Sequence, residues 1–256
     1  MFDVGEQPRI SVVNKATVPL GFDLAKITGA LQVYVRHFLQ PVWDCPAHLT
    51  PAQDVLPGTW GLVFLDNADQ PGALAYHEMA ANGYPISLIF VKTTLDAGGL
   101  VSVSVSHELA EMLVDPPCTI MVMRNDGITF DSYEVADPVE GDQDGFLVEG
   151  FQMSNFVYPS WFEEFRGIGS AQFDHRHQLS APFTLTANGY RSFFNSKTQQ
   201  WDQQFGSAQK AEAFKKEDRR MHRLETRMGR MAKPGVVIAT PFPYGIQINP
   251  EQFLKP

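Results

Sequence analysis

The chain has 256 residues, of which 44% are hydrophobic and 19% are charged, and its formal net charge is −9. A chain of this length can bury a full core without disulfide bonds. With only two cysteines, Cys45 and Cys118, a disulfide framework and a cysteine-based zinc finger are excluded. No apolar run approaches the ~20 residues that span a bilayer, and no secretory signal is visible at the N-terminus, so no membrane contact is expected and a cytoplasmic location is predicted.

The charge is distributed unevenly along the chain. Residues 207–233 contain nine Lys and Arg against four Asp and Glu, a net charge of +5, which leaves −14 for the rest. An acidic body of this kind argues against a nucleic-acid-binding surface on the main domain.

The first third of the chain alternates strand-like and helix-like patterns. A helix is expected from Leu24, capped by Asp23 and ending at or near Pro41. Apolar or β-branched runs predict strands over 10–16, 59–67 and 87–94, an irregular strand and turn over 73–85, and a proline-rich connection over 45–58.

The patterns continue with a second helix from about Val103, where Ser104 or Ser106 can act as the cap. Asp115-Pro116-Pro117 must end this helix, because two prolines cannot continue it. Beyond it we expect a hairpin over 119–135 with an Asp126-Gly127 turn, an acidic loop over 137–145, and short strands and turns over 146–206.

The last fifty residues differ in kind from the rest. Apolar residues in 208–232 follow a short heptad pattern, and the tail that follows is apolar and rich in proline. We therefore predict three parts: a metal-binding domain over 1–206, a basic amphipathic helix over 207–233 and an extended apolar tail over 234–256. A homo-oligomer or larger assembly is expected to form through 208–256.

The residues that best fit a chemical role are in the segment His107-Glu108-Leu109-Ala110-Glu111. On a helix, His107 and Glu111 lie on one face and can bind one cation, while Glu108 lies about 100° around the helix, near a water bound to that cation. This is the arrangement of HExxH zinc hydrolases with Glu in place of the second His. The predicted metal is zinc, and Ca²⁺, Mn²⁺ and Fe²⁺ remain alternatives. A helix rich in Glu and His without a metal can produce the same pattern by chance.

Two further carboxylates follow this helix after about twenty residues. Glu134 and Asp137 lie in the segment Tyr-Glu-Val-Ala-Asp. One is expected as a third ligand, and the other as a partner that orients His107.

The segments SHELAEMLVDP and YEVADPVE resemble a signature of metzincin-like or gluzincin-like metallopeptidase domains in uncharacterised bacterial and phage proteins, and a related pattern in plant exordium-like proteins. The resemblance covers roughly 60–205. It implies a zincin-like α+β fold, with a mixed and mostly parallel sheet and an active-site helix. It also implies His107, Glu111 and Glu134 as ligands, Asp137 as a fourth ligand or orienting group, and Glu108 as the general base.

The chain departs from the known patterns at several positions. Metzincins would have His at positions 111 and 117, where this chain has Glu111 and Pro117, and Gly where it has Val114. The gluzincin Asp lies four residues after the ligand Glu, whereas here the gap is three. A resemblance of fold does not by itself establish peptidase activity.

Other polar residues offer lesser candidates. Tyr133, Tyr158 and His77 are candidate donors to an oxyanion. The acidic loop has spacing like that of a calcium site but misses the EF-hand pattern, so a solvated turn is the expectation. His175 and His177 are expected to share one face of a surface strand.

Two functions from different classes follow from these patterns. The first is a zinc-dependent hydrolase that acts on peptides or proteins. The second is a non-catalytic phage virion or assembly protein that retains the zincin-like fold and clasps its neighbours through the C-terminal helix and tail, in which case its location is the virion. A metal-stabilised binding module without turnover is a third possibility.

Overall fold

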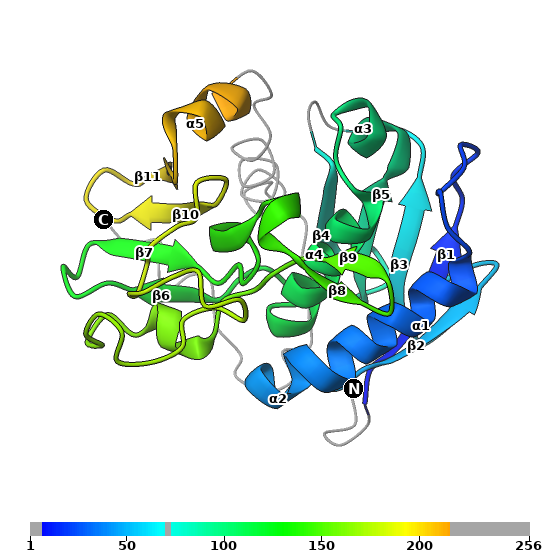
Figure 1. Ribbon diagram of the computed structural model, residues 1–256, viewed down its shortest axis with the longest axis horizontal. Helices are drawn as coiled ribbons and strands as arrows, with labels where there is room; N and C mark the ends of the chain where they lie inside the picture. Colours follow the sequence, from blue (N-terminus) through cyan, green and yellow to red (C-terminus); the bar gives the residue numbers. More distant parts are fainter. Residues whose placement is uncertain (1–6, 70–72, 216–256) are drawn as a thin grey trace, which may run out of the picture.

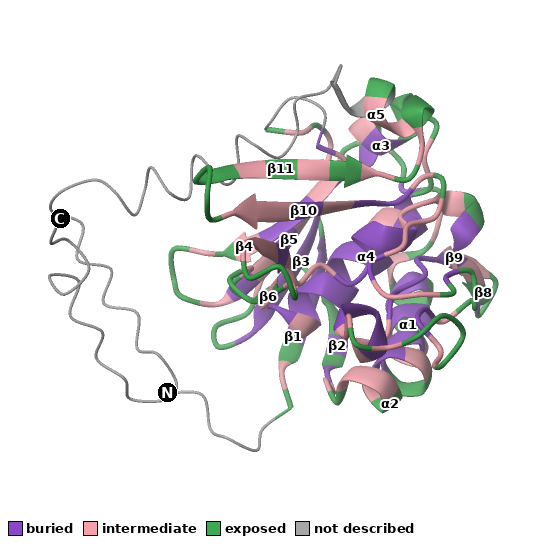
Figure 2. Ribbon diagram, turned by 90° about the vertical axis from the view of Figure 1, so that its left-hand side faces the viewer, coloured by how far each residue is buried: buried purple, intermediate pink, exposed green. Residues whose placement is uncertain are grey.

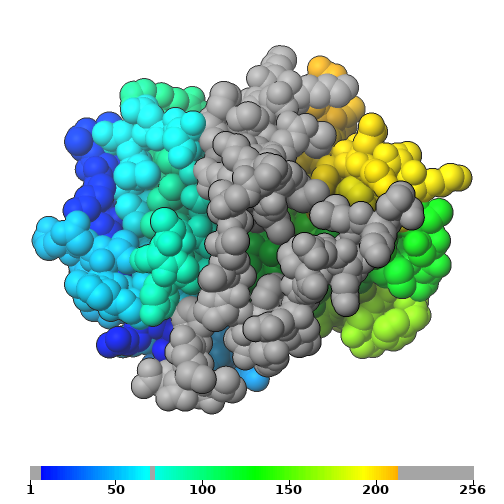
Figure 3. Space-filling view, turned by 180° about the vertical axis from the view of Figure 1, so that it is seen from behind, coloured from blue at the N-terminus to red at the C-terminus, as the bar shows by residue number. Residues whose placement is uncertain are grey.

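The computed structural model describes residues 7–69 and 73–215, which form an α+β fold, as the sequence predicts (Figure 1). A mostly parallel sheet and its helices are built from residues 7–69 and 73–115, the parallel-sheet region. Residues 116–206, the antiparallel region, form short antiparallel strands and turns. In Figure 3 surface atoms of the parallel-sheet region, blue to teal, and of the antiparallel region, green to yellow, occupy opposite sides of the view.

The parallel-sheet region contains five strands in the order β2-β1-β3-β5-β4. All neighbours are parallel except β4, which runs antiparallel to β5. Central strands are buried on both faces, which explains their nearly continuous apolar sequences. The bounds are β1 (Arg9–Asn14), β2 (His48–Ala52), β3 (Trp60–Leu65), β4 (Ala75–Met79) and β5 (Pro85–Phe90).

One strand, β2, lies within the segment expected to be a proline-rich connection, so that prediction was wrong. Pro51 lies in this strand, opposite Val12 of β1. Because β2 is at the edge of the described sheet, the missing N–H of the proline need not break the ladder. The proline-rich composition of 45–58 gave no sign of this strand.

The first helix begins as predicted, with the Asp23 carboxylate accepting a hydrogen bond from the Lys26 N–H. The helical path then passes Pro41, contrary to expectation, because this proline lies in the first turn of a new helix and not in a helix interior. It runs through α1 (Leu24–Tyr34), a π-helical turn (Val35–Leu39) and α2 (Gln40–Trp43).

The second predicted helix is α4 (Val101–Val114), which starts two residues earlier than expected. Leu100 is at the N-cap without a side-chain cap, so the expected serine cap is wrong. The Ser106 hydroxyl instead bonds to the Ser102 carbonyl and accepts the Ser154 N–H. The strand predicted over 87–94 ends at Phe90, and a short helix, α3 (Val91–Asp96), follows.

The antiparallel region contains a four-stranded sheet in the order β11-β10-β7-β6 and a separate β8–β9 hairpin. The predicted hairpin with its Asp126-Gly127 turn is confirmed as β6 and β7. The bounds are β6 (Met121–Met123), β7 (Thr129–Ser132), β8 (Phe146–Val148), β9 (Phe151–Met153), β10 (Tyr190–Asn195) and β11 (Gln200–Phe205), with 3-10 turns at Asp137–Val139, Asp142–Asp144 and Pro159–Phe162.

A single large core joins the two regions, with α4 inside it. Figure 2 shows α4 purple along most of its length, whereas β11 at the edge is pink and green. Two hydrogen bonds tie α1 and α2 to the antiparallel region: the Tyr34 hydroxyl donates to the Ser154 carbonyl and the Trp43 indole to the Val157 carbonyl.

The basic C-terminal helix begins as α5 (Ala208–Lys215). The rest of the predicted heptad helix and the whole predicted tail lie outside the described residues. Among the residues the structure describes, no helix has the length and apolar character needed to cross a membrane.

Candidate metal centre

The segment 107–111, which contains the predicted metal ligands, lies on α4, a helix buried on nearly all sides. It packs against β4 and β5, against α1, and against β9 of the antiparallel region. Burial of this kind suits its apolar residues but is costly for His107, Glu108 and Glu111, each at most 5% exposed. Buried ionisable groups persist where they are paired or bind a cation.

His107, Glu111 and Asp137 form the first group that can hold a metal, with their ligand atoms within 4.8 Å of one another. The Nε2 atom of His107 lies 3.2 Å from Oε1 of Glu111 and 3.3 Å from Oδ1 of Asp137. This nitrogen is buried and has no aligned hydrogen-bond partner. A buried imidazole nitrogen that faces two carboxylates fits a metal cation.

The two carboxylates are held in place by other groups. Glu111 Oε1 accepts the backbone N–H groups of Ala136 and Asp137, at 3.3 and 3.2 Å. Asp137 Oδ1 accepts the hydroxyl of Tyr190 at 2.5 Å. Such outer contacts fix the orientation of ligands before a metal binds.

The electrostatics of this group reflect crowding of acidic side chains. Burial raises the pKa of Glu111 well above its usual value, and the neighbouring Asp137 raises it further, while His107 acts in the opposite direction. Burial lowers the pKa of His107, but Glu111, Asp137 and Glu108 together lift it well above its usual value. Both shifts arise because negative charge is concentrated in a site shielded from water.

A second group consists of His77, Glu108 and Glu111, whose ligand atoms also lie within 4.8 Å of one another. His77, on β4, places Nδ1 at 3.1 Å from Oε2 of Glu108. Its Nε2 lies 3.2 Å from the Asp115 carbonyl oxygen and 2.8 Å from Sγ of Cys118. The sequence suggested His77 only as an oxyanion donor, because no spacing rule links a strand residue to a helix that begins about 25 positions later.

Glu134 belongs to neither group. It is half-buried, and its Oε2 atom is buried without a hydrogen-bond partner. Its charge raises the pKa values of Glu111, Asp115 and His77, which places it near both groups. Its predicted role as a ligand stays a prediction.

A cavity of about 340 Å³ opens beside the first group and has His107 and Glu108 in its wall. This volume is at the lower end of the range for ligand pockets. The remaining wall comes from 73–75 at the start of β4, from 97–99 and 103–104, from 140–143, and from Asn188 and Lys210.

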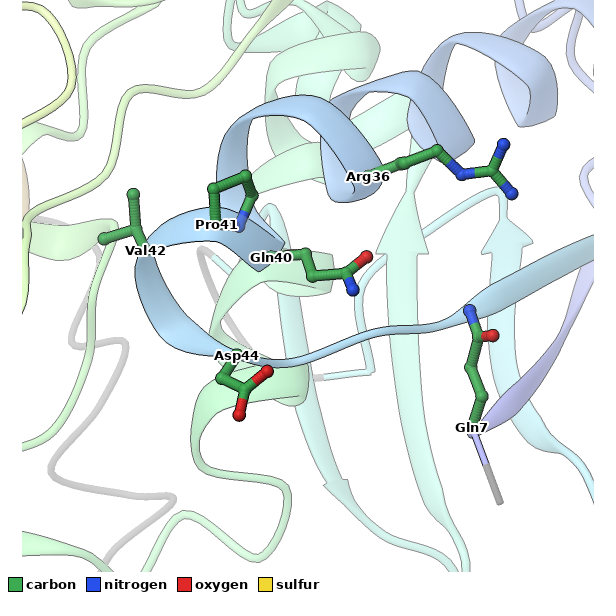
Figure 4. Close-up of a pocket in the computed structure, with 6 residues that line it drawn as sticks. All are labelled: Gln7, Arg36, Gln40, Pro41, Val42 and Asp44. Atoms are coloured by element: carbon green, nitrogen blue, oxygen red, sulfur yellow. The ribbon is translucent and has the colours of Figure 1, made fainter. Parts of the chain in front are cut away.

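A larger hollow, of about 630 Å³, lies at the end of the first helix and is lined by none of the site residues (Figure 4). The charged ends of Arg36 and Asp44 do not converge in it. We therefore place the chemistry in the smaller cavity.

The lesser candidates have other environments. Tyr133 stacks on Phe162, with ring centroids 4.1 Å apart, and the Tyr158 hydroxyl lies 3.3 Å from His175, so both belong to aromatic clusters outside the cavity wall. The expected strand at His175 and His177 is wrong: these residues lie in a turn, in which His177 has a φ of 57°.

The acidic loop folds into two 3-10 turns whose carboxylates have protein partners. Glu140 pairs with Lys210, Asp142 accepts the Leu100 N–H, and Asp144 accepts bonds from Gln178 and Thr186. Of these loop residues only Asp137 belongs to a possible metal group within the described ranges.

Comparison of the sequence with protein-family models found no match, and comparisons with curated proteins and with solved structures found none either.

Proposed function

We propose that the protein is a metal-dependent hydrolase that uses zinc and acts on peptide bonds. The observation that carries the proposal is the buried, unpartnered Nε2 of His107, which faces carboxylate oxygens of Glu111 and Asp137. An imidazole with two carboxylates suits zinc, and the oxygen-rich set also suits Mn²⁺ or Fe²⁺.

The residues around the cavity supply the rest of the chemistry. A bound divalent cation lowers the pKa of water and polarises a carbonyl group. Glu108, in the cavity wall beside His107, would act as the general base that accepts the proton of the attacking water. The Nδ1 atom of His77 lies 3.1 Å from the Glu108 carboxylate, and Tyr190 and two backbone N–H groups keep Asp137 and Glu111 in position.

The peptide substrate is proposed on the resemblance of SHELAEMLVDP and YEVADPVE to metallopeptidase domains. The residues just before β4, together with its first residue, form part of the cavity wall.

The test is the metal content of the full chain. Protein freed of metal by a chelator is incubated with zinc, desalted and analysed by elemental mass spectrometry. His107→Ala and Glu111→Ala are compared with His37→Ala, a control in which an exposed histidine on the first helical segment is removed.

We expect about one or more tightly held zinc ions in the wild type and in the control, and loss of the tightly held ion in both site variants. Equal zinc in His107→Ala and in the wild type would overturn the proposal. A metal-loaded wild type is then assayed on a peptide library with Glu108→Gln as the inactive control. Bound metal without turnover would indicate the binding module.

The assembly role is carried by the basic helix and tail, and most of that segment lies outside the described residues. It stays a second prediction. Removal of 216–256 and measurement of the mass in solution test it: an unchanged mass would remove its main support.

A further inference from the structure

We propose that His77, Glu108 and Glu111 form a second site for a divalent transition-metal cation, which shares Glu111 with the first. The inference rests on the proposed function for the first site and adds a second ion next to it. The three side chains come from β4 and from α4, and all are at most 3% exposed.

The hydrogen bonds of His77 favour a metal at its Nδ1 atom. The carbonyl oxygen of Asp115, 3.2 Å from Nε2, can only accept, so a neutral His77 ring is expected to carry its hydrogen on Nε2. Metal-binding histidines commonly donate their second ring N–H to a backbone carbonyl in this way. The Nδ1 atom of that neutral ring faces the Oε2 atom of Glu108 at 3.1 Å, a separation at which both atoms can bind one cation.

Buried carboxylates are concentrated around the two groups. Glu108, Glu111, Asp115 and Asp137 are each at most 3% exposed. In their ionised forms they place several negative charges in a small volume shielded from water. Concentrated buried charge is costly, so a second divalent cation would stabilise the cluster.

A cation at the second site changes what Glu108 can do. Its carboxylate is the proposed proton acceptor, and a carboxylate that binds a cation is a weaker base. The second ion is therefore expected to regulate the first site, with metal in excess of one equivalent lowering turnover.

The experiment is a zinc titration of the chelator-treated full chain, followed by calorimetry and by elemental analysis. Wild type, His77→Ala and Glu108→Gln are compared with His48→Ala, which removes an exposed histidine on β2. Glu108→Gln preserves side-chain volume, so it decides the matter if His77→Ala does not fold, as judged by circular dichroism.

We expect two equivalents in the wild type and in the control. His77→Ala should retain one, and Glu108→Gln should bind the second ion at least about tenfold more weakly. A wild type that saturates at one equivalent would overturn the second site and leave the proposed function standing. No zinc in the wild type would overturn both, and two unchanged equivalents in either folded variant would overturn the second site alone.

Cobalt provides an independent spectroscopic measurement. In the wild type, addition of a second cobalt ion should diminish the paramagnetic resonance signal of the first through coupling across the shared Glu111. Signals that simply add would contradict a shared carboxylate.

Discussion

The parallel-sheet region and the antiparallel region are stabilised in different ways. The first buries long apolar strands beneath helices, and Leu62 and Phe64 of β3 have no exposed surface. The second uses short strands and buried polar contacts, such as Asp131 paired with Arg124 and Arg191. The candidate metal centre draws on both, because His77, His107 and Glu111 come from the first region and Asp137 from the second. The apolar parallel-sheet region thus supplies most of the candidate ligands, and the more polar antiparallel region supplies Asp137.

The largest expected effect is the loss of apolar packing in the parallel-sheet region. Leu62→Ala removes a fully buried side chain from the central strand and should lower the free energy of unfolding by about 2–5 kcal/mol. Leu147→Ala, on the exposed side of β8 in the antiparallel region, should change it by less than about 0.5 kcal/mol. Urea denaturation measures both, and similar losses would contradict the contrast between the regions.

The next largest effect is expected at a tight backbone contact in the antiparallel region. A Cβ atom on Gly189 would overlap the carbonyl oxygen of Pro138, the residue after Asp137. Gly189→Ala should therefore lower stability by about 1–3 kcal/mol and weaken zinc binding, since the turn that holds Asp137 must move.

The control for Gly189→Ala is Gly29→Ala in α1. No atom lies within 4 Å of the added carbon there, so this change should raise stability by up to about 1 kcal/mol. An unchanged zinc affinity in Gly189→Ala would show that Asp137 does not contribute to the metal centre.

A smaller and more specific effect is expected at Tyr190. Tyr190→Phe removes the hydroxyl that bonds to Asp137 and should weaken zinc binding by about tenfold. Tyr76→Phe is the matched control, because its hydroxyl bonds to Asp69 at 2.7 Å, and neither residue is among the possible ligands. Calorimetry on both variants measures the difference, and equal affinities would show that Tyr190 has no part in the site.

The smallest effect concerns the β6–β7 turn and its dependence on pH. Hydrogen bonds from the Thr129 and Ile128 N–H groups, then from the Thr129 hydroxyl, lower the pKa of Asp126 from 3.8 to about 2. The ionised form therefore stabilises the fold above pH 3.8, and this stabilisation is lost as the pH falls through about 2. Wild type should exceed Asp126→Asn in stability at pH 5, and the difference should be mostly lost at pH 2. A constant difference would rule out the charge as its source.

The sequence predicted the parallel-sheet region better than the antiparallel region. Repeating apolar patterns and the Asp23 cap identified β1, β3, α1 and α4, because local propensity and burial agree there. The pattern on α4 also brought His107, Glu108 and Glu111 to notice. Long-range contacts leave no such pattern: the approach of His77 to Glu108 joins positions 31 apart, and that of Tyr190 to Asp137 joins positions 53 apart.

The bond from Tyr190 to Asp137 has a consequence for the order of events during synthesis. A nascent chain that has left the ribosome only as far as α4 already carries His107 and Glu111, but the strand that fixes Asp137 is still to be made. The group of His107, Glu111 and Asp137 is complete and held in place only after β10 has joined its sheet. If the proposed cation is bound, its uptake is expected to be a late step of maturation, and bound metal would report that both regions of the molecule have packed together.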